Sequence, residues 1–306
     1  MALKRDFTKL LDITEEEGRY LLKRAQLLKK IRKSRDDFKP LKDKNLAMIF
    51  EKASTRTRVS FEVGMRELGG NTVFLNPGES QIGRGEPIRD TARVLSRYVD
   101  AIMIRTYSQN NVDELAQWAA VPVINGLSDL YHPCQVLADL FTIEEHKGDI
   151  QAVRIAYIGD GNNMANSWIE AAILFGLTLS VASPRGYEPD EALLKQVQGN
   201  KGFLFTDNPE EAVDGADVVN TDVWASMGQE NQKEKRKQAF AGYRVDAGLL
   251  AHAKKDAVVM HCLPAYRNEE ISEDILEKHQ EVIFTQAENR LHAQKALLEW
   301  LILKQF

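Results

Sequence analysis

Residues 51–62 read Glu-Lys-Ala-Ser-Thr-Arg-Thr-Arg-Val-Ser-Phe-Glu, and the predicted fold is built outward from this stretch. The apolar residues 46–50 before it are typical of a buried strand in a parallel sheet, and residues 59–65 after it have helical spacing. A helix amino terminus offers unpaired N–H groups and a positive dipole end, and here hydroxyl and guanidinium side chains share that turn. We therefore expect an anion site, for phosphate; the simpler alternative is a serine N-cap followed by a solvated basic turn.

Length and composition indicate a soluble protein of two domains. The chain has 306 residues, 43% of them apolar and 28% charged, with a formal net charge of −5, so it has no basic field for nucleic acid. Its first residues lack the apolar core of a signal peptide, and no run approaches the length of a membrane span, so we expect a cytoplasmic location. The two cysteines, Cys134 and Cys262, lack zinc-site spacing and are too few for a disulfide framework, so we expect reduced thiols.

Short apolar runs alternate with helical patterns along the whole chain. The runs comprise residues 46–50, 72–75, 101–105, 121–125, 153–158, 177–181, 216–222 and 257–262. This alternation predicts an α/β protein of two domains, each a parallel β-sheet flanked by helices. A glycine stop at Lys147-Gly148-Asp149 follows a predicted helix over residues 132–147, so we divide the domains into residues 1–148 and 149–289.

Polar residues at predicted strand ends are the next candidates, because ligands bind beyond the carboxyl ends of parallel strands. Arg105 ends one run, and its planar fork suits phosphate and carbonyl oxygens, although a surface salt bridge is the alternative. His132 and Gln135 lie one turn apart at a helix start, where both could orient a small planar ligand. An ordinary capping or core histidine is the alternative for His132.

The glycine turn after residues 153–158 raises the question of a dinucleotide site. Gly159 and Gly161 begin a G-x-G-x-x-G pattern, but the next glycine is Gly176, so the sequence gives a nicotinamide dehydrogenase only weak support. Asn162 and Asn163 are better placed to bind a small polar substrate. In the second domain, Cys262 ends another predicted strand, and inert packing is its alternative role.

Four motifs in this order resemble those of the aspartate/ornithine carbamoyltransferase family. They are Ser-Thr-Arg-Thr-Arg at 54–58, His-Pro-Cys-Gln at 132–135, Asp-Val-Trp-Ala-Ser-Met-Gly at 222–228 and His-Cys-Leu-Pro at 261–264. The resemblance extends over essentially the whole chain, and it implies that helices join the domains and that the terminal helix, residues 290–306, packs back on the first. The motif at 222–228 is typical of ornithine-type members, because aspartate-type members bind a second carboxylate with basic side chains instead.

The resemblance also implies roles for individual residues. The residues implied in carbamoyl phosphate binding are Ser54, Thr55, Arg56, Thr57, Gln81, Arg105, His132, Gln135, Cys262, Leu263 and Arg290. Those implied in ornithine binding are Asn163, Asp222, Ser226 and Met227, with Asp222 and Ser226 accepting from the α-ammonium group. The implied catalytic residues are Arg105, His132, Asp222 and Cys262. Gln81 would reach the site of a neighbouring subunit, and Arg84 in the same loop is a further candidate.

The implied reaction is carbamoyl transfer from carbamoyl phosphate to the δ-amine of L-ornithine, giving L-citrulline and phosphate. No metal or organic cofactor is implied, the expected assembly is a homotrimer with shared sites, and arginine biosynthesis is favoured over catabolism. Two alternatives stay open: transfer to a related amine such as putrescine, lysine or N-acetylornithine, and a non-catalytic binding protein with the same fold. The motif at 222–228 disfavours an acceptor without a free α-amino acid head.

Overall fold

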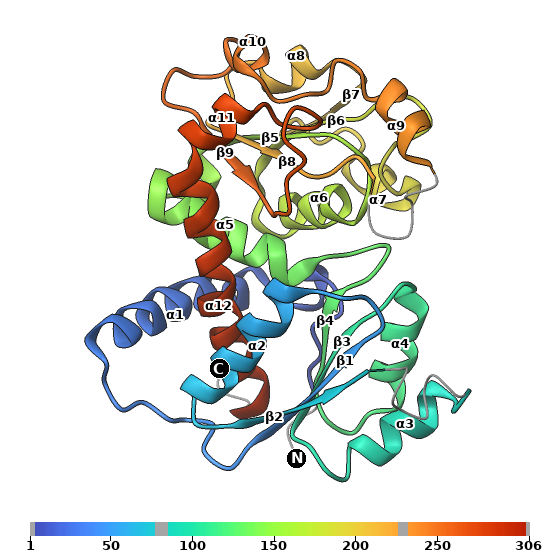
Figure 1. The fold of residues 1–306 in the computed structure, drawn as a ribbon, viewed down its shortest axis with the longest axis vertical. Coiled ribbons are helices and arrows are strands. Elements are labelled where there is room, and N and C mark those ends of the chain that lie inside the picture. The colour runs from blue at the N-terminus through green and yellow to red at the C-terminus, as the bar shows by residue number, and fades with distance from the viewer. Residues whose placement is uncertain (1–3, 77–84, 226–231, 304–306) are drawn as a thin grey trace. The chain divides into compact units, whose positions relative to one another are not determined.

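The computed structural model describes residues 4–76, 85–225 and 232–303. The chain divides into two compact units: unit 1 comprises Met1–Phe141 and Asn289–Phe306, and unit 2 comprises Thr142–Glu288. Two helices, α5 (Pro133–Lys147) and α12 (Gln280–Leu303), carry the chain from one unit into the other (Figure 1). Along the chain, the first division between the units falls inside α5, after Phe141, whereas the boundary predicted from the sequence lies at the end of this helix.

Unit 1 is built on a four-stranded parallel sheet with the order β2-β1-β3-β4. Its strands are β1 (Asn45–Phe50), β2 (Asn71–Leu75), β3 (Ala101–Arg105) and β4 (Val123–Leu127). Its other elements are η1 (Leu10–Asp12), α1 (Glu15–Ser34), α2 (Thr55–Glu67), α3 (Ile88–Leu95) and α4 (Gln109–Trp118). Alternate residues of β1 and β3 pack with α3 and α4 in one apolar cluster, and α2 lies on the other side of the sheet (Figure 1). Both faces are therefore covered, as a parallel sheet requires.

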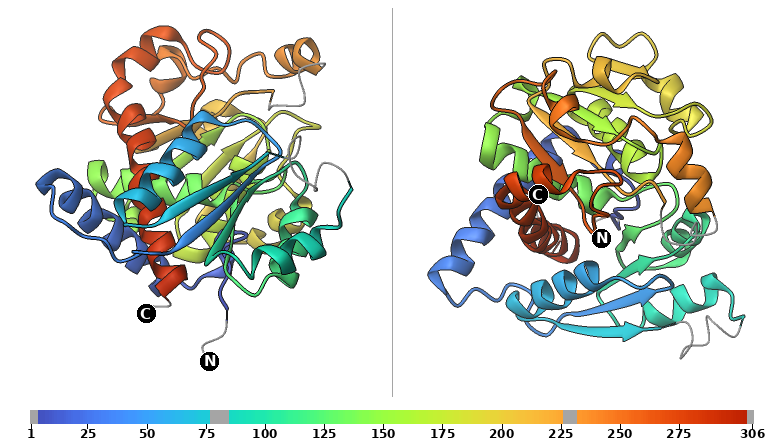
Figure 2. Two further views of the ribbon diagram at one scale, coloured as in Figure 1. Left: turned by 60° about the horizontal axis from the view of Figure 1, so that its bottom comes forward. Right: turned by 45° about the horizontal axis from the view of Figure 1, so that its top comes forward.

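The carboxyl-terminal part of α12 packs against α2 within unit 1 (Figure 2). A Cβ atom added to Gly64 would meet Lys295 Cγ at 3.2 Å and Leu291 Cδ1 at 3.4 Å, so the glycine permits this close approach. Lys295 Nζ also donates to Glu67 Oε2 at 2.8 Å. These contacts fix the last segment of the chain to the helix that follows the Ser-Thr-Arg-Thr-Arg stretch.

Unit 2 contains a five-stranded parallel sheet with the order β7-β6-β5-β8-β9. Its strands are β5 (Arg154–Ile158), β6 (Thr178–Ala182), β7 (Phe203–Thr206), β8 (Val218–Thr221) and β9 (Val258–His261). Its other elements are η4 (Ile150–Ala152), α6 (Asn163–Phe175), α7 (Glu191–Val197), α8 (Pro209–Val213), α9 (Lys233–Ala239), α10 (Ala247–Leu250) and α11 (Glu273–Lys278). The strand order reverses at β5, which places the carboxyl ends of β5 and β8 at a topological switch point.

The predicted fold class, two parallel sheets flanked by helices, is confirmed. Two element predictions were wrong in detail. Strand β7 was not predicted, because its four residues, Phe203–Thr206, form too short an apolar run to stand out after Lys-Gly. Helix α12 begins at Gln280 rather than at residue 291, so the β-branched residues of 282–285 are helical because tertiary packing outweighs their weak propensity.

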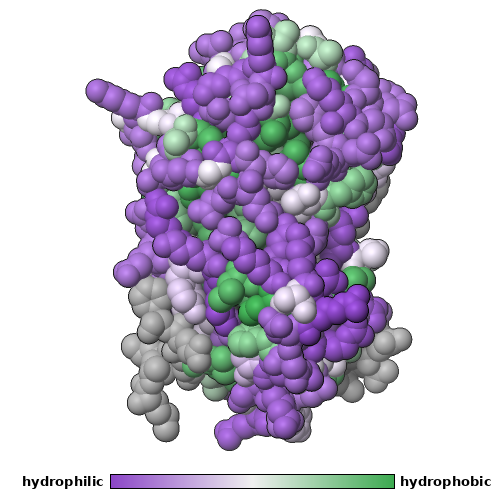
Figure 3. All heavy atoms as spheres, turned by 90° about the vertical axis from the view of Figure 1, so that its left-hand side faces the viewer, coloured by the Kyte–Doolittle hydropathy of each residue, from purple (hydrophilic) through white to green (hydrophobic). Residues whose placement is uncertain are grey.

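No helix in the described parts of the chain is both long enough and apolar enough to cross a membrane. On the face drawn in Figure 3, most side chains are hydrophilic, and apolar ones occur in small separate groups. This surface agrees with the high content of charged residues.

Candidate active site

The Ser-Thr-Arg-Thr-Arg stretch forms the amino terminus of α2, directly beyond the carboxyl end of β1. Ser54 is the N-cap residue, and its side-chain oxygen accepts from the Thr57 backbone N–H at 3.2 Å. Thr55 and Arg56 occupy the first helical turn, whose remaining N–H groups have no intrahelical acceptor. Ser54 is therefore an N-cap, as the simpler alternative predicts, and the N–H donors of the same turn suit the anion site that stays a prediction.

Two arginines from distant parts of unit 1 converge on Thr57. Its hydroxyl oxygen accepts from Arg290 Nη2 at 2.6 Å and lies 3.5 Å from Arg105 Nη1. All three residues are buried, although the chain separates Thr57 from Arg290 by most of its length. Two guanidinium groups and a helix amino terminus therefore form a buried cationic site, which suits a phosphate or a developing oxyanion.

His132 and Gln135 lie at the start of α5, and the Gln135 N–H donates to the His132 carbonyl oxygen at 3.1 Å. Burial lowers the pKa of His132 well below its ordinary value, and the charges of Arg290 and Arg105 lower it further. The imidazole is therefore neutral at neutral pH, and it can donate one hydrogen bond to a carbonyl oxygen without adding charge.

Not every residue of the predicted anion site faces it. Arg58 is exposed, donates to Glu62 Oε1 at 2.9 Å and stacks on the Phe74 ring at 3.8 Å, so it contributes to the surface of α2. Gln81 and Arg84, which were predicted to reach a neighbouring subunit, lie outside the described residues.

In unit 2, polar side chains gather beyond the carboxyl ends of β5, β8 and β9. Asp222 follows β8, and its Oδ1 accepts from the Cys262 thiol at 3.0 Å. Its Oδ2 accepts from Asn162 Nδ2 at 3.4 Å, and Asn162 Oδ1 accepts from Tyr157 Oη at 3.2 Å. The sequence-predicted Asp222 and Cys262 are thus in direct contact, and the carboxylate has the charge and position to bind an ammonium group.

The remaining predicted residues of unit 2 lie close to this group in the chain. Asn163 is buried in the first turn of α6. The Leu263 N–H donates to His261 Nδ1 at 2.9 Å, and Leu263 has a left-handed backbone with φ of 57°. Ser226 and Met227 lie outside the described residues.

Sequence reasoning missed a buried ion pair beside Asp222. Arg236 Nη1 donates to Asp160 Oδ2 at 2.7 Å and to the Trp224 carbonyl oxygen at 2.8 Å. Burial raises the pKa of Asp160 to about 6, with Arg236 opposing the rise and Asp222 adding to it. Asp160 lies two residues beyond the end of β5 and could have been found by the strand-end rule, whereas nothing distinguishes Arg236 from the other charged residues of α9.

The glycine turn of unit 2 is used for packing. A Cβ atom added to Gly161 would lie 2.2 Å from the backbone of Glu188 and of Pro189, and the Gly161 N–H donates to the Tyr187 carbonyl oxygen at 2.9 Å. In a dinucleotide-binding turn, glycine allows the pyrophosphate to approach the backbone. Here the chain itself occupies that position, which argues against the dehydrogenase alternative.

One trio of potential metal ligands occurs among the described residues. Ligand atoms of Asp222, His261 and Cys262 lie within 4.8 Å of one another. However, His261 Nδ1 accepts from Leu263, and its Nε2 lies 3.0 Å from Glu270 Oε1, so both ring nitrogens are already engaged. This arrangement fixes a neutral tautomer with its proton on Nε2 and favours an ordering role for His261 over metal ligation.

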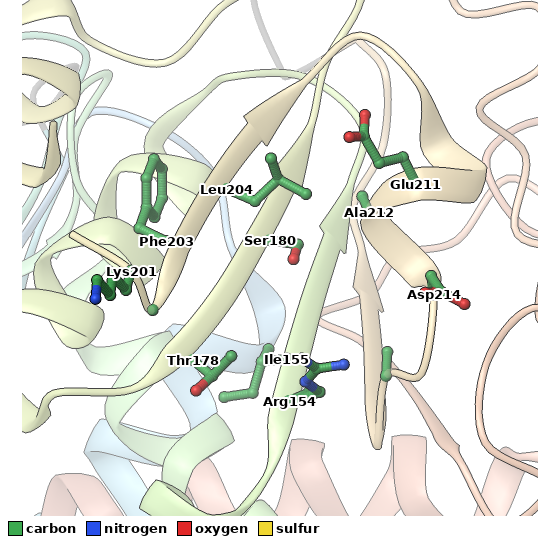
Figure 4. Close-up of a pocket in the computed structure, with 12 residues that line it drawn as sticks. Arg154, Ile155, Thr178, Ser180, Lys201, Phe203, Leu204, Glu211, Ala212 and Asp214 are labelled. Carbon is green, nitrogen blue, oxygen red and sulfur yellow. The ribbon is translucent and has the colours of Figure 1, made fainter. Parts of the chain in front are cut away.

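A separate pocket of about 300 Å³ lies in unit 2 (Figure 4). Arg154 and Thr178, which line it, are the first residues of β5 and β6, so the pocket is at the amino ends of these strands. The group around Asp222 lies at their carboxyl ends. Glu211 and Lys201 also line the pocket, and its mixed charges favour neither anions nor cations.

Family models match almost the entire chain. The model of the aspartate/ornithine carbamoyltransferase carbamoyl-P binding domain matches residues 5–145, and that of the Asp/Orn binding domain matches residues 151–301. The first match contains Thr57, Arg105 and His132, and the second contains Asp222 and Cys262.

Individual relatives are similar to this chain over all or nearly all of their lengths. The chain is 52% identical over 301 residues to the ornithine carbamoyltransferase of Syntrophotalea carbinolica, covering 98% of this chain and 100% of that protein. Among solved structures, the ornithine carbamoyltransferase of Pyrococcus furiosus has a TM-score of 0.94 at 50% identity, covering 99% of this chain and 98% of that one. The anabolic ornithine carbamoyltransferase of Campylobacter jejuni has a TM-score of 0.92 at 44% identity, covering 98% and 100%. By sequence and by fold, this chain belongs to the aspartate/ornithine carbamoyltransferase family.

Proposed function

We propose that this chain transfers the carbamoyl group of carbamoyl phosphate to the δ-amine of L-ornithine, giving L-citrulline and phosphate. The observation that carries the proposal is the convergence of Arg105 and Arg290 on Thr57 at the amino terminus of α2. Relatives about 50% identical over their full lengths, all named ornithine carbamoyltransferases, support the choice of reaction. In this proposal residues 1–148 and 290–306 bind carbamoyl phosphate, and residues 149–289 bind ornithine.

The residues of unit 1 fit the demands of the acyl donor. Attack on the carbonyl carbon places negative charge on its oxygen, which Thr57, Arg105 and neutral His132 would stabilise by hydrogen bonds. The departing phosphate needs cations and N–H donors, which Ser54, Thr55, Arg56 and the α2 turn would supply. Arg290 and Gln135 would hold the carbamoyl group, with Gln81 reaching in from a neighbouring subunit.

The residues of unit 2 fit the demands of the amine. Ornithine's δ-ammonium, with a pKa near that of lysine, about 10.4, must lose a proton before it attacks. In our proposal Asp222 and Cys262 orient the δ-amine, Asn163 meets the α-carboxylate, and Asp222, Ser226 and Met227 bind the amino acid head. A carbon–nitrogen bond then forms, the carbon–oxygen bond to phosphate breaks, and the phosphate takes up the proton that the nitrogen releases.

The finer assignments rest on the relatives and on composition. We propose a homotrimer with shared sites, and we favour arginine biosynthesis because the similar Campylobacter jejuni enzyme is described as anabolic. We propose a cytoplasmic location, in which the two cysteines, Cys134 and Cys262, would stay reduced.

The test is citrulline formation from carbamoyl phosphate and ornithine, beside parallel assays with aspartate, putrescine, lysine and N-acetylornithine. We expect strong preference for ornithine. We also expect Thr57→Val to lower turnover roughly a hundredfold or more, because it removes an oxyanion donor, whereas Thr57→Ser keeps the hydroxyl. Preference for another acceptor would keep the carbamoyl phosphate assignment and overturn the assignment of residues 149–289.

A further inference from the structure

Gln135 forms a side-chain pair with Asp139, one turn later on the same helix α5. Gln135 Nε2 donates to Asp139 Oδ1 at 2.8 Å, and both side chains are completely buried. The donor atom is Nε2, so the amide turns its NH₂ group toward Asp139. The carbonyl oxygen of Gln135 is therefore directed away from Asp139.

That carbonyl oxygen is an unfilled acceptor. Gln135 Oε1 is buried and has no hydrogen-bond partner among the residues that the structure describes. Buried acceptors are rarely left unfilled, because their loss of water costs free energy. An acceptor in this position is ready for a donor brought by a ligand.

A second glutamine–aspartate pair in unit 1 has the same spacing, but its glutamine carbonyl oxygen is filled by the protein itself. On α4, Gln109 Nε2 donates to Asp113 Oδ1 at 2.9 Å with the same spacing along the helix. There, however, the Gln109 carbonyl oxygen accepts from Ser128 Oγ at 2.6 Å and from Asn125 Nδ2 at 3.1 Å. The glutamine carbonyl oxygen on α4 thus has donors within the protein, whereas that of Gln135 on α5 has none among the described residues.

We propose that Asp139 is a positioning residue that fixes the polarity of the Gln135 amide, so that its carbonyl oxygen accepts an N–H from the carbamoyl group. This inference rests on the proposed function. His132 lies one turn before Gln135, close enough to Arg105 and Arg290 for their charges to act on it. The two arginines can only donate, so the carbamoyl NH₂ group needs an acceptor that they do not provide.

The proposal predicts how the site distinguishes two acyl phosphates. Acetyl phosphate has a methyl group where carbamoyl phosphate has an amino group, and it cannot donate to Gln135 Oε1. The wild-type protein should therefore bind acetyl phosphate more weakly. In Asp139→Asn, the asparagine can donate to Gln135 or accept from it, so the amide loses its fixed direction. The ratio of the two dissociation constants should fall about tenfold, the equivalent of one hydrogen bond.

Calorimetric titration of both acyl phosphates into each variant measures this ratio. Asp113→Asn is the matched control, since it alters the pair on α4, and it should keep the wild-type ratio. Asp139→Ser is a second variant, because its hydroxyl can also donate or accept. A wild-type ratio in a folded Asp139 variant overturns the proposal. If neither Asp139 variant folds while Asp113→Asn does, Asp139 is structural and the proposal also fails.

The same titrations separate this inference from the proposed function. A wild-type protein that binds no carbamoyl phosphate and forms no citrulline would refute the proposed function itself. Binding and turnover by the wild type, with an unchanged ratio in Asp139→Asn, would refute only the role of Asp139.

Discussion

At the scale of single residues, the chemistry depends on side chains whose surroundings change their protonation. Burial and the charges of Arg290 and Arg105 keep His132 neutral. Burial raises the pKa of the Cys134 thiol to about 12, although Cys134 lies between His132 and Gln135. Cys134 also donates to the Asn125 carbonyl oxygen at 3.3 Å, so it is a packed thiol, in contrast to Cys262, which contacts Asp222.

Asp160 should make the stability of the protein depend on pH. Burial raises its pKa in the folded protein to about 6, above its value of about 3.9 in an unfolded chain. The folded state therefore binds the proton more tightly, and its extra stability, present at low pH, is lost as the pH rises through 6. Between pH 5 and pH 7.5 the loss should be roughly 1.4 kcal/mol.

Urea unfolding of the wild type and of Asp160→Asn at these two pH values measures the difference. The asparagine variant should lack this part of the pH dependence, because it has no proton to exchange. Asp214→Asn, at an exposed position of the same unit, controls for the loss of one acidic side chain. Equal pH dependence in the wild type and in Asp160→Asn would show that Asp160 is ionised throughout the range.

At the scale of elements, two helices of unit 1 begin with the same kind of N-cap hydrogen bond. Ser54 and Thr14 each cap a helix by accepting from the backbone N–H of the third helical residue at 3.2 Å. The Ser54 cap lies at the proposed phosphate site on α2, and the Thr14 cap begins α1. A comparison of substitutions at the two positions therefore distinguishes the effect of losing a cap from the effect of losing a ligand contact.

Both Ser54→Ala and Thr14→Ala should lower the free energy of unfolding by about 1 kcal/mol, because each removes one N-cap bond. Only Ser54→Ala should also weaken carbamoyl phosphate binding. Urea unfolding and steady-state kinetics on the two variants measure the two effects. Equal activity in both variants would mean that Ser54 is a cap and nothing more.

Most elements could be predicted from the sequence, because strands of a covered parallel sheet are continuous apolar runs bounded by helical patterns. The local parts of the site could also be predicted, because Ser54 through Thr57 are neighbours in the chain, as are His132 and Gln135. The contact of Arg290 with Thr57 could not be predicted, because it depends on how α12 packs against α2. The role proposed for Asp139 could not be predicted for another reason. It lies within an apolar helical pattern, where a single acidic residue does not indicate a function.

At the scale of the whole molecule, the proposed trimer predicts complementation between inactive variants. Gln81 and Arg105 would belong to the same site but to different subunits. Gln81→Ala and Arg105→Ala should each be inactive alone. After dissociation and random reassembly, about a quarter of the sites would combine an intact Gln81 with an intact Arg105, so activity should recover to about that fraction.

Citrulline assays on the separate and the reassembled proteins, with gel filtration to verify mixed oligomers, test this prediction. Mixed oligomers that stay inactive would mean that both residues serve one subunit's own site. Reassembly of the wild type through the same procedure gives the activity expected for complete recovery.

The division of the chain into units also bears on the order in which they are completed. Unit 1 begins the chain but ends with Asn289–Phe306, after all of unit 2. During synthesis, domains fold as their residues emerge from the ribosome. Unit 2 therefore has its full sequence available first, although it comes second. The bonds from Arg290 to Thr57 and from Lys295 to Glu67 form only when these residues of α12, which follow unit 2 in the chain, have emerged. The proposed carbamoyl phosphate site thus needs a residue that is translated after all of unit 2, so a nascent chain cannot bind that substrate fully before Arg290 has emerged.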